Sequence, residues 1–182
     1  MGDSGIGAVV ENADARWMRA ALAEAREAAE RFDEVPIGAV VVSEGGELLA
    51  AAGNRTRTAC DPTAHAEVVA LREAARRAGT FRLTGATVYS TIEPCAMCAG
   101  ALVQARVRRL VYGARDERAG AVESVFRVCD SDALNHRIEL TAGVLEAECR
   151  GLMQQFFRAR RKTEVRGQRS EVSEDSESAT NF

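Results

Sequence analysis

The sequence predicts an α/β fold, a three-layer α/β/α sandwich around a mixed, mostly parallel five-stranded sheet. Two observations support this prediction. Short β-branched runs alternate along the chain with longer stretches of helical periodicity, the order that builds a parallel sheet covered by helices. The chain also has 182 residues, of which 46% are hydrophobic, enough for one domain with a substantial core and short for two.

A helix and a strand pair are expected at the start of the chain. Residues 14–32 repeat alanine and leucine at helical spacing among charged side chains, and Asp14 is a candidate N-cap. The run IGAVVV (37–42) predicts a strand, and LLAAAG (48–53) predicts its returning partner after a Gly-Gly turn. We therefore expect an antiparallel hairpin beside an amphipathic helix.

Two strand-to-strand crossovers are expected next. Residues 61–79 have the pattern of an amphipathic helix, and ATVYST (86–91) that of a strand. A second helix over 95–106 and a strand in RRLVYGA (108–114) follow. Crossovers that join parallel strands of one sheet are nearly always right-handed. The middle of the chain is therefore expected to form the parallel part of the sheet.

The last third of the chain is expected to complete the sheet and then leave the domain. HRIEL (136–140) is a candidate strand, and a helix is predicted from about Gly143. We predict a disordered N-terminus over residues 1–13 and a folded domain over 14–162. A basic, then acidic, tail over 163–182 has too few apolar residues to fold and is expected to be disordered.

Charge and cysteine content limit the expected partners and location. The formal net charge is −3, so a nucleic acid would have to be held by a local basic patch. Five cysteines in a chain of this size favour a reducing compartment over a disulfide framework. The first residues lack the features of a secretory signal, and no apolar run approaches the roughly 20 residues of a membrane helix. We expect a cytoplasmic protein with no membrane contact.

The candidate chemistry lies where two of the predicted helices begin. His65 and Glu67 stand two residues apart, Cys95 and Cys98 stand three apart, and each pair follows a proline that marks an abrupt helix start. Two thiolates and one neutral imidazole form a Zn²⁺ site with an open fourth position, the catalytic rather than the structural pattern. Glu67, roughly 200° around the helix from His65, would then move protons instead of binding metal. The combination H-x-E and P-C-x-x-C is the known signature of zinc deaminases.

Each part of this pattern also has a simpler explanation when it is taken alone. A Cys-x-x-Cys pair after a strand is typical of thiol–disulfide proteins as well. A single histidine is more often a cap or a satisfied polar group, and a glutamate in a first helical turn fits ordinary helix-dipole chemistry. A zinc-organised RNA-binding module without catalysis, and a deaminase of free bases or nucleosides, are further alternatives.

Beyond these motifs, the chain resembles the bacterial tRNA-specific adenosine deaminases, a family with the cytidine-deaminase-like fold. The similarity covers about residues 14–162, and the stretches DPTAHAE, GARD and FFRARR point to the tRNA branch of the superfamily. The matching stretches are EVPIGAVVV (34–42), GNR (53–55), DPTAHAE (61–67), TIEPCAMCAGAL (91–102), VYGARD (111–116), LNHRIE (134–139) and FFRARR (156–161).

The resemblance implies an enzyme that hydrolyses adenosine to inosine at the wobble position of a tRNA anticodon. It implies a homodimer with one zinc ion per subunit, held by His65, Cys95 and Cys98. Glu67 would take a proton from the zinc-bound water, protonate the ring nitrogen beside C6, and later protonate the departing ammonia.

The resemblance also implies substrate contacts. Asn54 would hydrogen-bond the flipped base, Ile37 and Pro94 would line its pocket, and Asp116 would lie in a loop that touches the neighbouring nucleotides. From spacing alone, Asn54 could equally be a turn residue and Asp116 a helix cap. An anticodon loop already presents unpaired bases, so extruding one costs less than opening a duplex.

A basic cluster near the C-terminus predicts an RNA phosphate patch, because arginine and lysine neutralise phosphates. The patch comprises Arg158, Arg160, Arg161 and Lys162, with Arg166 and Arg169 further on. Four acidic residues follow between positions 171 and 177, and we expect them to screen the patch in the free protein.

A loop and several isolated residues lie outside the matching motifs. Residues 121–133 lack the small Gly-Ser step and the His-His-Pro run of many family members, which leaves the RNA contacts of this loop open. His136 is expected to be structural, and Cys60, Cys129 and Cys149 are expected to behave as small hydrophobic residues.

Overall fold

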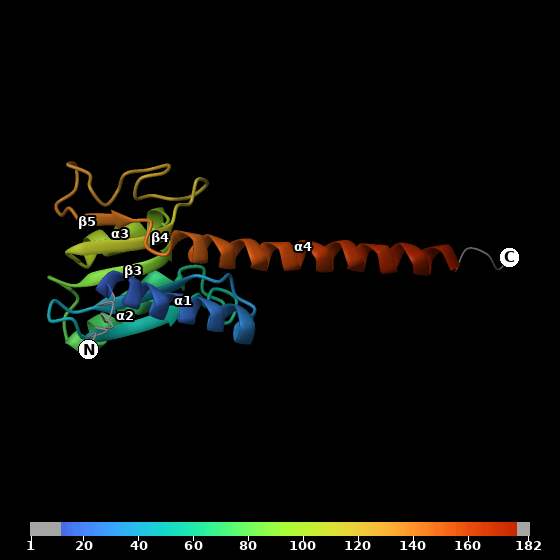
Figure 1. Cartoon of the computed structure of the whole chain (residues 1–182), viewed down its shortest axis with the longest axis horizontal. Helices are drawn as coiled ribbons and strands as arrows, with labels where there is room; N and C mark the ends of the chain where they lie inside the picture. The colour runs from blue at the N-terminus through green and yellow to red at the C-terminus, as the bar shows by residue number, and fades with distance from the viewer. Residues whose placement is uncertain (1–11, 178–182) are drawn as a thin grey trace, which may run out of the picture.

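A central five-stranded sheet, with strand order β2-β1-β3-β4-β5, lies between two layers of helices in the computed structural model (Figure 1). The structure describes the backbone of residues 12–177 and the side chains of residues 12–161. The strands are β1 (Gly38–Val42), β2 (Leu48–Gly53), β3 (Thr87–Ile92), β4 (Arg109–Ala114) and β5 (Glu139–Ala142). The helices are α1 (Ala13–Phe32), α2 (Ala66–Ala78), α3 (Ala96–Gln104) and α4 (Glu146–Glu177).

The strand pairings confirm the mixed five-stranded sheet. β1 pairs antiparallel with both β2 and β3, whereas β3 with β4 and β4 with β5 are parallel pairs. The parallel pairings are confined to the β3-β4-β5 half because β1 lies between β2 and β3. β2 and β3 run in the same direction and are joined through α2, so β1 alone runs opposite to the other four strands, and the mostly parallel sheet is confirmed.

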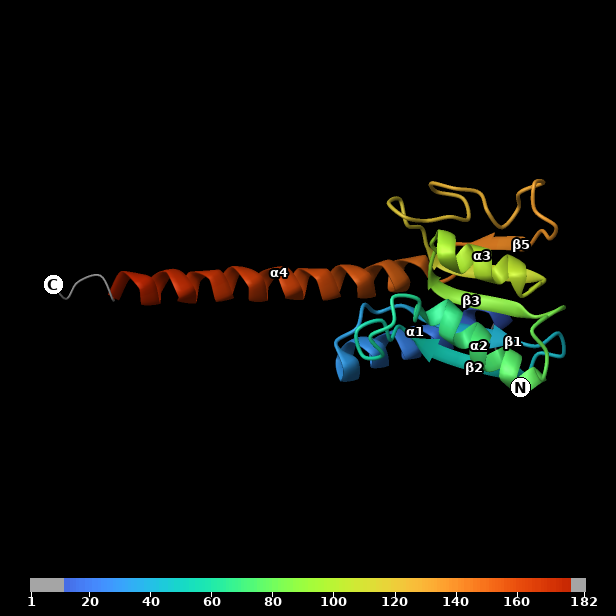
Figure 2. The same ribbon diagram turned by 180° about the vertical axis from the view of Figure 1, so that it is seen from behind.

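Helices cover both faces of the sheet. α1 and α4 pack on one face and α2 and α3 on the other; Figure 1 looks onto α1, and Figure 2, from behind, onto α2 and α3. All five residues of β1 are buried, and they alternate between the two layers. Ala39 and Val41 belong to the core beneath α2 and α3, and Val40 and Val42 to the core beneath α1. This alternation confirms the three-layer sandwich.

One glycine lets helix α1 lie directly against the sheet. A Cβ atom on Gly38 would lie 1.9 Å from the carbonyl oxygen of Ala21 and 2.7 Å from the backbone nitrogen of Ala25. Real Cβ atoms do not approach backbone atoms so closely, so any larger residue would push the helix away from β1. The layer spacing on this face depends on the missing side chain.

Several helix starts differ from the expected positions by a few residues. α1 is capped by Asn12, whose Oδ1 accepts a hydrogen bond from the Asp14 backbone N–H at 3.0 Å, so Asp14 is not the cap. The Asp14 carboxylate instead pairs with Arg109 at 2.8 Å. α2 and α3 begin just after His65 and Cys95, which occupy the N-cap positions rather than the first turns. Both residues have extended backbone conformations.

Helix α4 continues beyond the sheet into the segment expected to be disordered. It runs to Glu177, so residues 163–177 are helical (Figure 1). The segment contains four glutamates and two arginines, residue types with a high helix propensity. The N-terminal disorder was expected over residues 1–13, of which Asn12 and Ala13 are the cap and the first residue of α1. Residues 1–11 and 178–182 lie outside the described residues. Within the described part of the chain, no helix is long and apolar enough to cross a membrane.

Candidate metal and catalytic site

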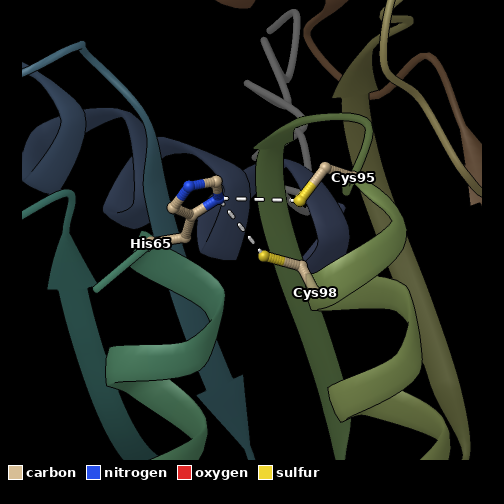
Figure 3. Close-up of side chains that lie close together, drawn as sticks. All are labelled: His65, Cys95 and Cys98. Carbon is tan, nitrogen blue, oxygen red and sulfur yellow. Dashed lines mark hydrogen bonds between the residues drawn. The ribbon is translucent and has the colours of Figure 1, made fainter. Parts of the chain in front are cut away.

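The three predicted metal ligands converge between the starts of α2 and α3. Their ligand atoms all lie within 4.8 Å of one another. Nδ1 of His65 is 3.6 Å from Sγ of Cys95 and 3.5 Å from Sγ of Cys98, and the side chains point toward one another (Figure 3). Neither His65 nor Cys95 caps its own helix with its side chain. The extended N-cap conformation therefore turns both side chains toward a shared point.

The three ligand groups shift one another's pKa values, and only the shift of Cys95 favours the deprotonated form. Hydrogen bonds with Cys98 and then with His65 lower the pKa of the Cys95 thiol to about 3. The hydrogen bond with Cys95, together with burial, raises the pKa of Cys98, and a hydrogen bond with Cys95 raises that of His65. Two thiols and an imidazole are soft ligands that zinc prefers, and three of them leave room for a fourth. The residues present therefore fit a catalytic zinc site.

Glu67 lies beside the ligands and is almost fully buried, with 3% of its surface exposed. The hydroxyl of Ser90 lies 3.1 Å from Oε1, and the thiol of Cys98 lies 3.5 Å from Oε2. Burial raises the pKa of this carboxyl, as a group that accepts and returns a proton near neutral pH requires. Ser90, on β3, orients the carboxylate and was not predicted, because a serine in a strand carries no distinguishing pattern.

Asn54 connects the end of β2 to the start of α2. It is 4% exposed, and its Oδ1 accepts a hydrogen bond from the Ala66 N–H at 3.1 Å, between His65 and Glu67 in the chain. The backbone N–H of Asn54 donates to the carbonyl of Ile37 at 3.0 Å. Within the described part of the chain, the side-chain Nδ2 of Asn54 has no hydrogen-bond partner, so it can still donate to a ligand. A structural role and a base-binding role for Asn54 are therefore compatible.

The Asp116 loop is tied to the ligand-bearing segment. The Asp116 carboxylate accepts bonds from the N–H groups of Arg118 at 3.0 Å and Ala119 at 3.2 Å. These bonds hold a turn rather than the start of a helix, so Asp116 is not a helix cap. The N–H of Ala121 donates to the carbonyl of Pro94 at 2.8 Å. Pro94 itself is buried. The loop thus packs beside the residue that precedes Cys95.

Glu93 is the buried anchor of this loop. Its carboxylate is 2% exposed and accepts from four backbone N–H groups and one hydroxyl. Burial alone would raise its pKa, but these hydrogen bonds, above all that of Ser124, outweigh it and lower the pKa. Gly120 passes so close that a Cβ there would lie 2.5 Å from Cδ of Glu93. Sequence reasoning missed this residue, because a glutamate before Pro-Cys is not distinguishable from a surface glutamate.

Glu34 anchors a second loop on the other side of the site. It is fully buried and accepts hydrogen bonds from the N–H groups of Arg57 and Thr58, each at 2.8 Å. The hydroxyls of Thr56 and Thr58 donate to it as well, at 3.1 and 2.8 Å. Burial would raise the Glu34 pKa, and these bonds outweigh that effect and lower it. The chain directly after Asn54 is held in place by this carboxylate.

The predicted phosphate patch is partly occupied by contacts within the protein. Arg160 forms an ion pair with Asp33 at 2.6 Å and stacks on the Phe156 ring at 4.6 Å. Arg158 donates to the side chain of Gln154 at 3.1 Å. Arg161 is exposed. The side chain of Lys162 and the acidic end of the chain lie outside the described residues.

The remaining residues singled out in the sequence have varied surroundings. His136 donates from Nε2 to the carbonyl of Val107 at 2.7 Å, a contact of the structural kind. Cys129 and Cys149 are buried among apolar side chains. The expectation for Cys60 is wrong: this thiol is exposed, in a turn where the backbone has φ of 49°.

The fold and the site define a class of enzyme, the deaminases with a His-Cys-Cys metal site and a buried glutamate. The family model for MafB19-like deaminases matches residues 12–161. The chain is 49% identical over 145 residues to the tRNA-specific adenosine deaminase of Agrobacterium fabrum, covering 80% of this chain and 94% of that one. It is 45% identical over 149 residues to the enzyme of that name from Bacillus subtilis, covering 82% and 91%.

Solved structures agree with these relatives. A structure from a study of A-to-I editing by tRNA:A34 deaminases superposes with a TM-score of 0.72 at 48% identity, covering 75% of this chain and 98% of that one. A guanine deaminase from Nitrosomonas europaea superposes with a TM-score of 0.66 at 28% identity, covering 78% and 83%. The chain belongs to the family of tRNA-specific adenosine deaminases.

Proposed function

We propose that this enzyme hydrolyses adenosine to inosine at the wobble position of a tRNA anticodon, with zinc held by His65, Cys95 and Cys98. The observation that carries the proposal is the convergence of these ligands on the buried Glu67 in a chain that is 43–49% identical to three named tRNA-specific adenosine deaminases. We also propose one zinc ion per subunit, a homodimer and a cytoplasmic location, as the family resemblance implies.

The metal and the carboxylate divide the chemistry between them. Zinc, when bound, supplies the Lewis acidity that makes water a usable nucleophile near neutral pH. The reaction adds water at C6 of adenine and releases ammonia, so protons must pass from the water to the ring and to the leaving group. Glu67 takes the proton of the attacking water, gives it to the ring nitrogen beside C6, and carries the second proton to the departing amine. Such a positioned group typically contributes about 10²–10⁴ in rate.

The remaining site residues hold the base. Asn54 donates from its amide to the flipped base, supported by its burial and its fixed bond to the start of α2. Ile37 and Pro94 line the base pocket. Ile37 accepts the backbone hydrogen bond of Asn54, and Pro94 directly precedes Cys95 in the chain. Asp116, in the loop anchored by Glu93, contacts the flanking nucleotides.

The C-terminal basic residues supply the outer RNA contacts. Arg158, Arg161 and Lys162 attract phosphates of the anticodon stem, and Arg160 joins them if its ion pair with Asp33 opens. The acidic residues between 171 and 177 screen this patch in the free protein. Removing residues 170–182 is then expected to tighten stem-loop binding at low salt, and an unchanged affinity would contradict the screening.

The substrate is tested with the zinc-loaded protein and an anticodon stem-loop that carries a wobble adenosine. A stem-loop with the adenosine moved into the paired stem is the matched control, and free adenosine, guanine and cytosine are assayed in parallel. We expect inosine from the wobble adenosine alone. Because guanine deaminases share the fold, faster turnover of free guanine than of the stem-loop would replace the proposal with a base deaminase.

A further inference from the structure

A basic hollow lies at the end of the sheet opposite the metal ligands. It has a volume of about 300 Å³ and is lined by Arg82, Thr84, Arg106 and His136. The first two residues precede β3 and Arg106 precedes β4, whereas Cys95 follows β3. Because β3 and β4 are parallel strands of six residues each, about 20 Å separates the two ends. The hollow is therefore distinct from the metal site.

The two arginines of the hollow have no carboxylate partner within the described part of the chain. Arg82 stacks over the Phe81 ring at 5.2 Å, and Arg106 donates to the backbone carbonyl of Asn135. None of the described residues that line the hollow is acidic. Within residues 12–161, no carboxylate therefore neutralises the positive charge of the two arginines, in a molecule whose formal net charge is negative.

Neighbouring arginines show the contrast. Arg108 pairs with Glu139 at 3.3 Å, and Arg137 pairs with Asp132. These pairs lie at the same end of the sheet as the hollow and close to it in sequence. The guanidinium groups of Arg82 and Arg106 nevertheless have no carboxylate partner among the described residues. Two guanidinium groups at one hollow repel each other weakly through solvent, and an anion bound between them would reverse this repulsion.

The hollow is held in place by the backbone around it. The N–H of Leu83 donates to the carbonyl of Ala105 at 2.7 Å, which joins the segment before β3 to the end of α3. Arg106 follows in the left-handed region, with φ of 59°. His136 is fixed through its Nε2–H on the Val107 carbonyl at 2.7 Å, and within the described residues no partner takes its Nδ1. The hollow is thus built before any ligand arrives.

We propose that this hollow binds a phosphate group. Guanidinium groups match the oxygens of a phosphate with paired N–H donors, and the hydroxyl of Thr84 adds one more donor. The volume is at the small end of the range for small-molecule sites, about 300–1,000 Å³. Phe81 is 72% exposed beside Arg82 and offers a stacking surface for an unpaired base. The phosphate belongs either to an RNA backbone or to a free nucleotide.

The two histidines of the chain make the test specific. Zinc-loaded full-length protein, labelled with ¹⁵N-histidine, is titrated with inorganic phosphate, with AMP and with a 12-mer of oligouridylate, which contains no adenosine. Ionic strength is held constant with chloride. We expect a saturable shift of the His136 ring signals and none of the His65 signals.

Variants identify the groups that bind. The double variant Arg82→Gln with Arg106→Gly is expected to bind at least tenfold more weakly than the parent; glycine is chosen because it suits the positive φ at this position. With Arg106→Lys in place of Arg106→Gly, part of the affinity should return. Arg82→Gln alone leaves the backbone untouched and serves if the double variant unfolds; it is expected to weaken binding about threefold or more. Arg76→Gln, which removes an exposed arginine from α2, is the control and should bind as the parent does.

The three probes distinguish the sources of the phosphate. An RNA backbone is supported if the oligouridylate binds more tightly than AMP. The slope of log affinity against log salt concentration should then fall in magnitude by about 1.4 when the two arginines are removed. Equal or tighter binding of AMP or phosphate supports a free nucleotide. A His136 signal that none of the probes moves, a shift confined to His65, or unchanged affinity in the Arg82 and Arg106 variants would overturn the proposal.

Discussion

Replacing Glu93 by glutamine is expected to loosen the loop beside the metal ligands. In the parent, Oε1 accepts from the N–H groups of Val122, Glu123 and Ser124, and Oε2 accepts from the Asp116 N–H and the Ser124 hydroxyl. Glutamine keeps one accepting oxygen, and the serine hydroxyl can turn to accept from the new amide. The Asp116 N–H, however, would then face a donor and lose its partner.

The expected magnitude follows from these contacts. A buried donor left without a partner costs about 1–3 kcal/mol, and the loss of charge assistance in the other bonds adds on the order of 1 kcal/mol. The free energy of unfolding should therefore fall by roughly 2–4 kcal/mol, a large part of the usual 5–15 kcal/mol. At about 2–4 °C per kcal/mol for a chain of this size, the melting temperature should fall by roughly 5–15 °C.

Urea and thermal unfolding of the zinc-loaded protein measure this effect. Glu117→Gln removes the same charge from an exposed position of the same loop and is the control. The Glu93 pKa is lowered in the folded protein, so its stabilisation is present above the unfolded pKa of about 4.3 and is lost as the pH falls through the folded pKa. Equal stability of the two variants at pH 7, or a difference that does not shrink in acid, would refute the role of Glu93.

Three further predictions concern packing, an ion pair and the metal site. Gly38→Ala should lower the free energy of unfolding by about 3 kcal/mol or more in urea, since its methyl would lie 1.9 Å from the Ala21 carbonyl oxygen. In the control Gly45→Ala, the methyl would meet only the Ser43 hydroxyl oxygen at 3.8 Å, an ordinary contact, and equal effects of the two changes would contradict this. Asp14→Asn should cost about 1–2 kcal/mol at neutral pH. Burial would raise the Asp14 pKa, but hydrogen bonds with Arg109 and Tyr89 outweigh it and lower the pKa. The cost of Asp14→Asn should therefore be present at neutral pH and vanish as the pH falls below the folded pKa. A cost that does not depend on pH would argue against the ion pair. Cys60→Ser should keep one zinc ion per chain by metal analysis, and its loss would make Cys60 a ligand.

The elements of the sheet could be predicted because their signals are local. The run 48–53 forms β2 with the predicted bounds, and the other β-branched runs lie within a few residues of the observed strands. Helix starts were less predictable, since Asn12 and Asp14 are both capping residue types and only the fold decides between them. The direction of β1 relative to β3 depends on tertiary packing, which no local pattern encodes.

The site was predictable where spacing and residue type combine, and not where burial decides. His65, Cys95 and Cys98 converge as their spacing and the family resemblance suggested. Glu34 and Glu93 could not be recognised, because a buried carboxylate differs from an exposed one only through the N–H groups that the folded loops bring to it. The loops that carry Asn54 and Asp116 are therefore explained by the structure rather than by the sequence.

Inosine formation by a Glu67→Ala variant tests most directly whether the buried carboxylate moves the protons of the reaction. Glu73→Ala, on the exposed side of the same helix, is the control. Both variants are loaded with zinc, and the bound metal and the stem-loop affinity are measured together with the rate. We predict that Glu67→Ala keeps zinc and RNA but loses at least about 10²-fold in rate, while Glu73→Ala matches the parent. Inosine formation at the parental rate by Glu67→Ala would contradict the assignment.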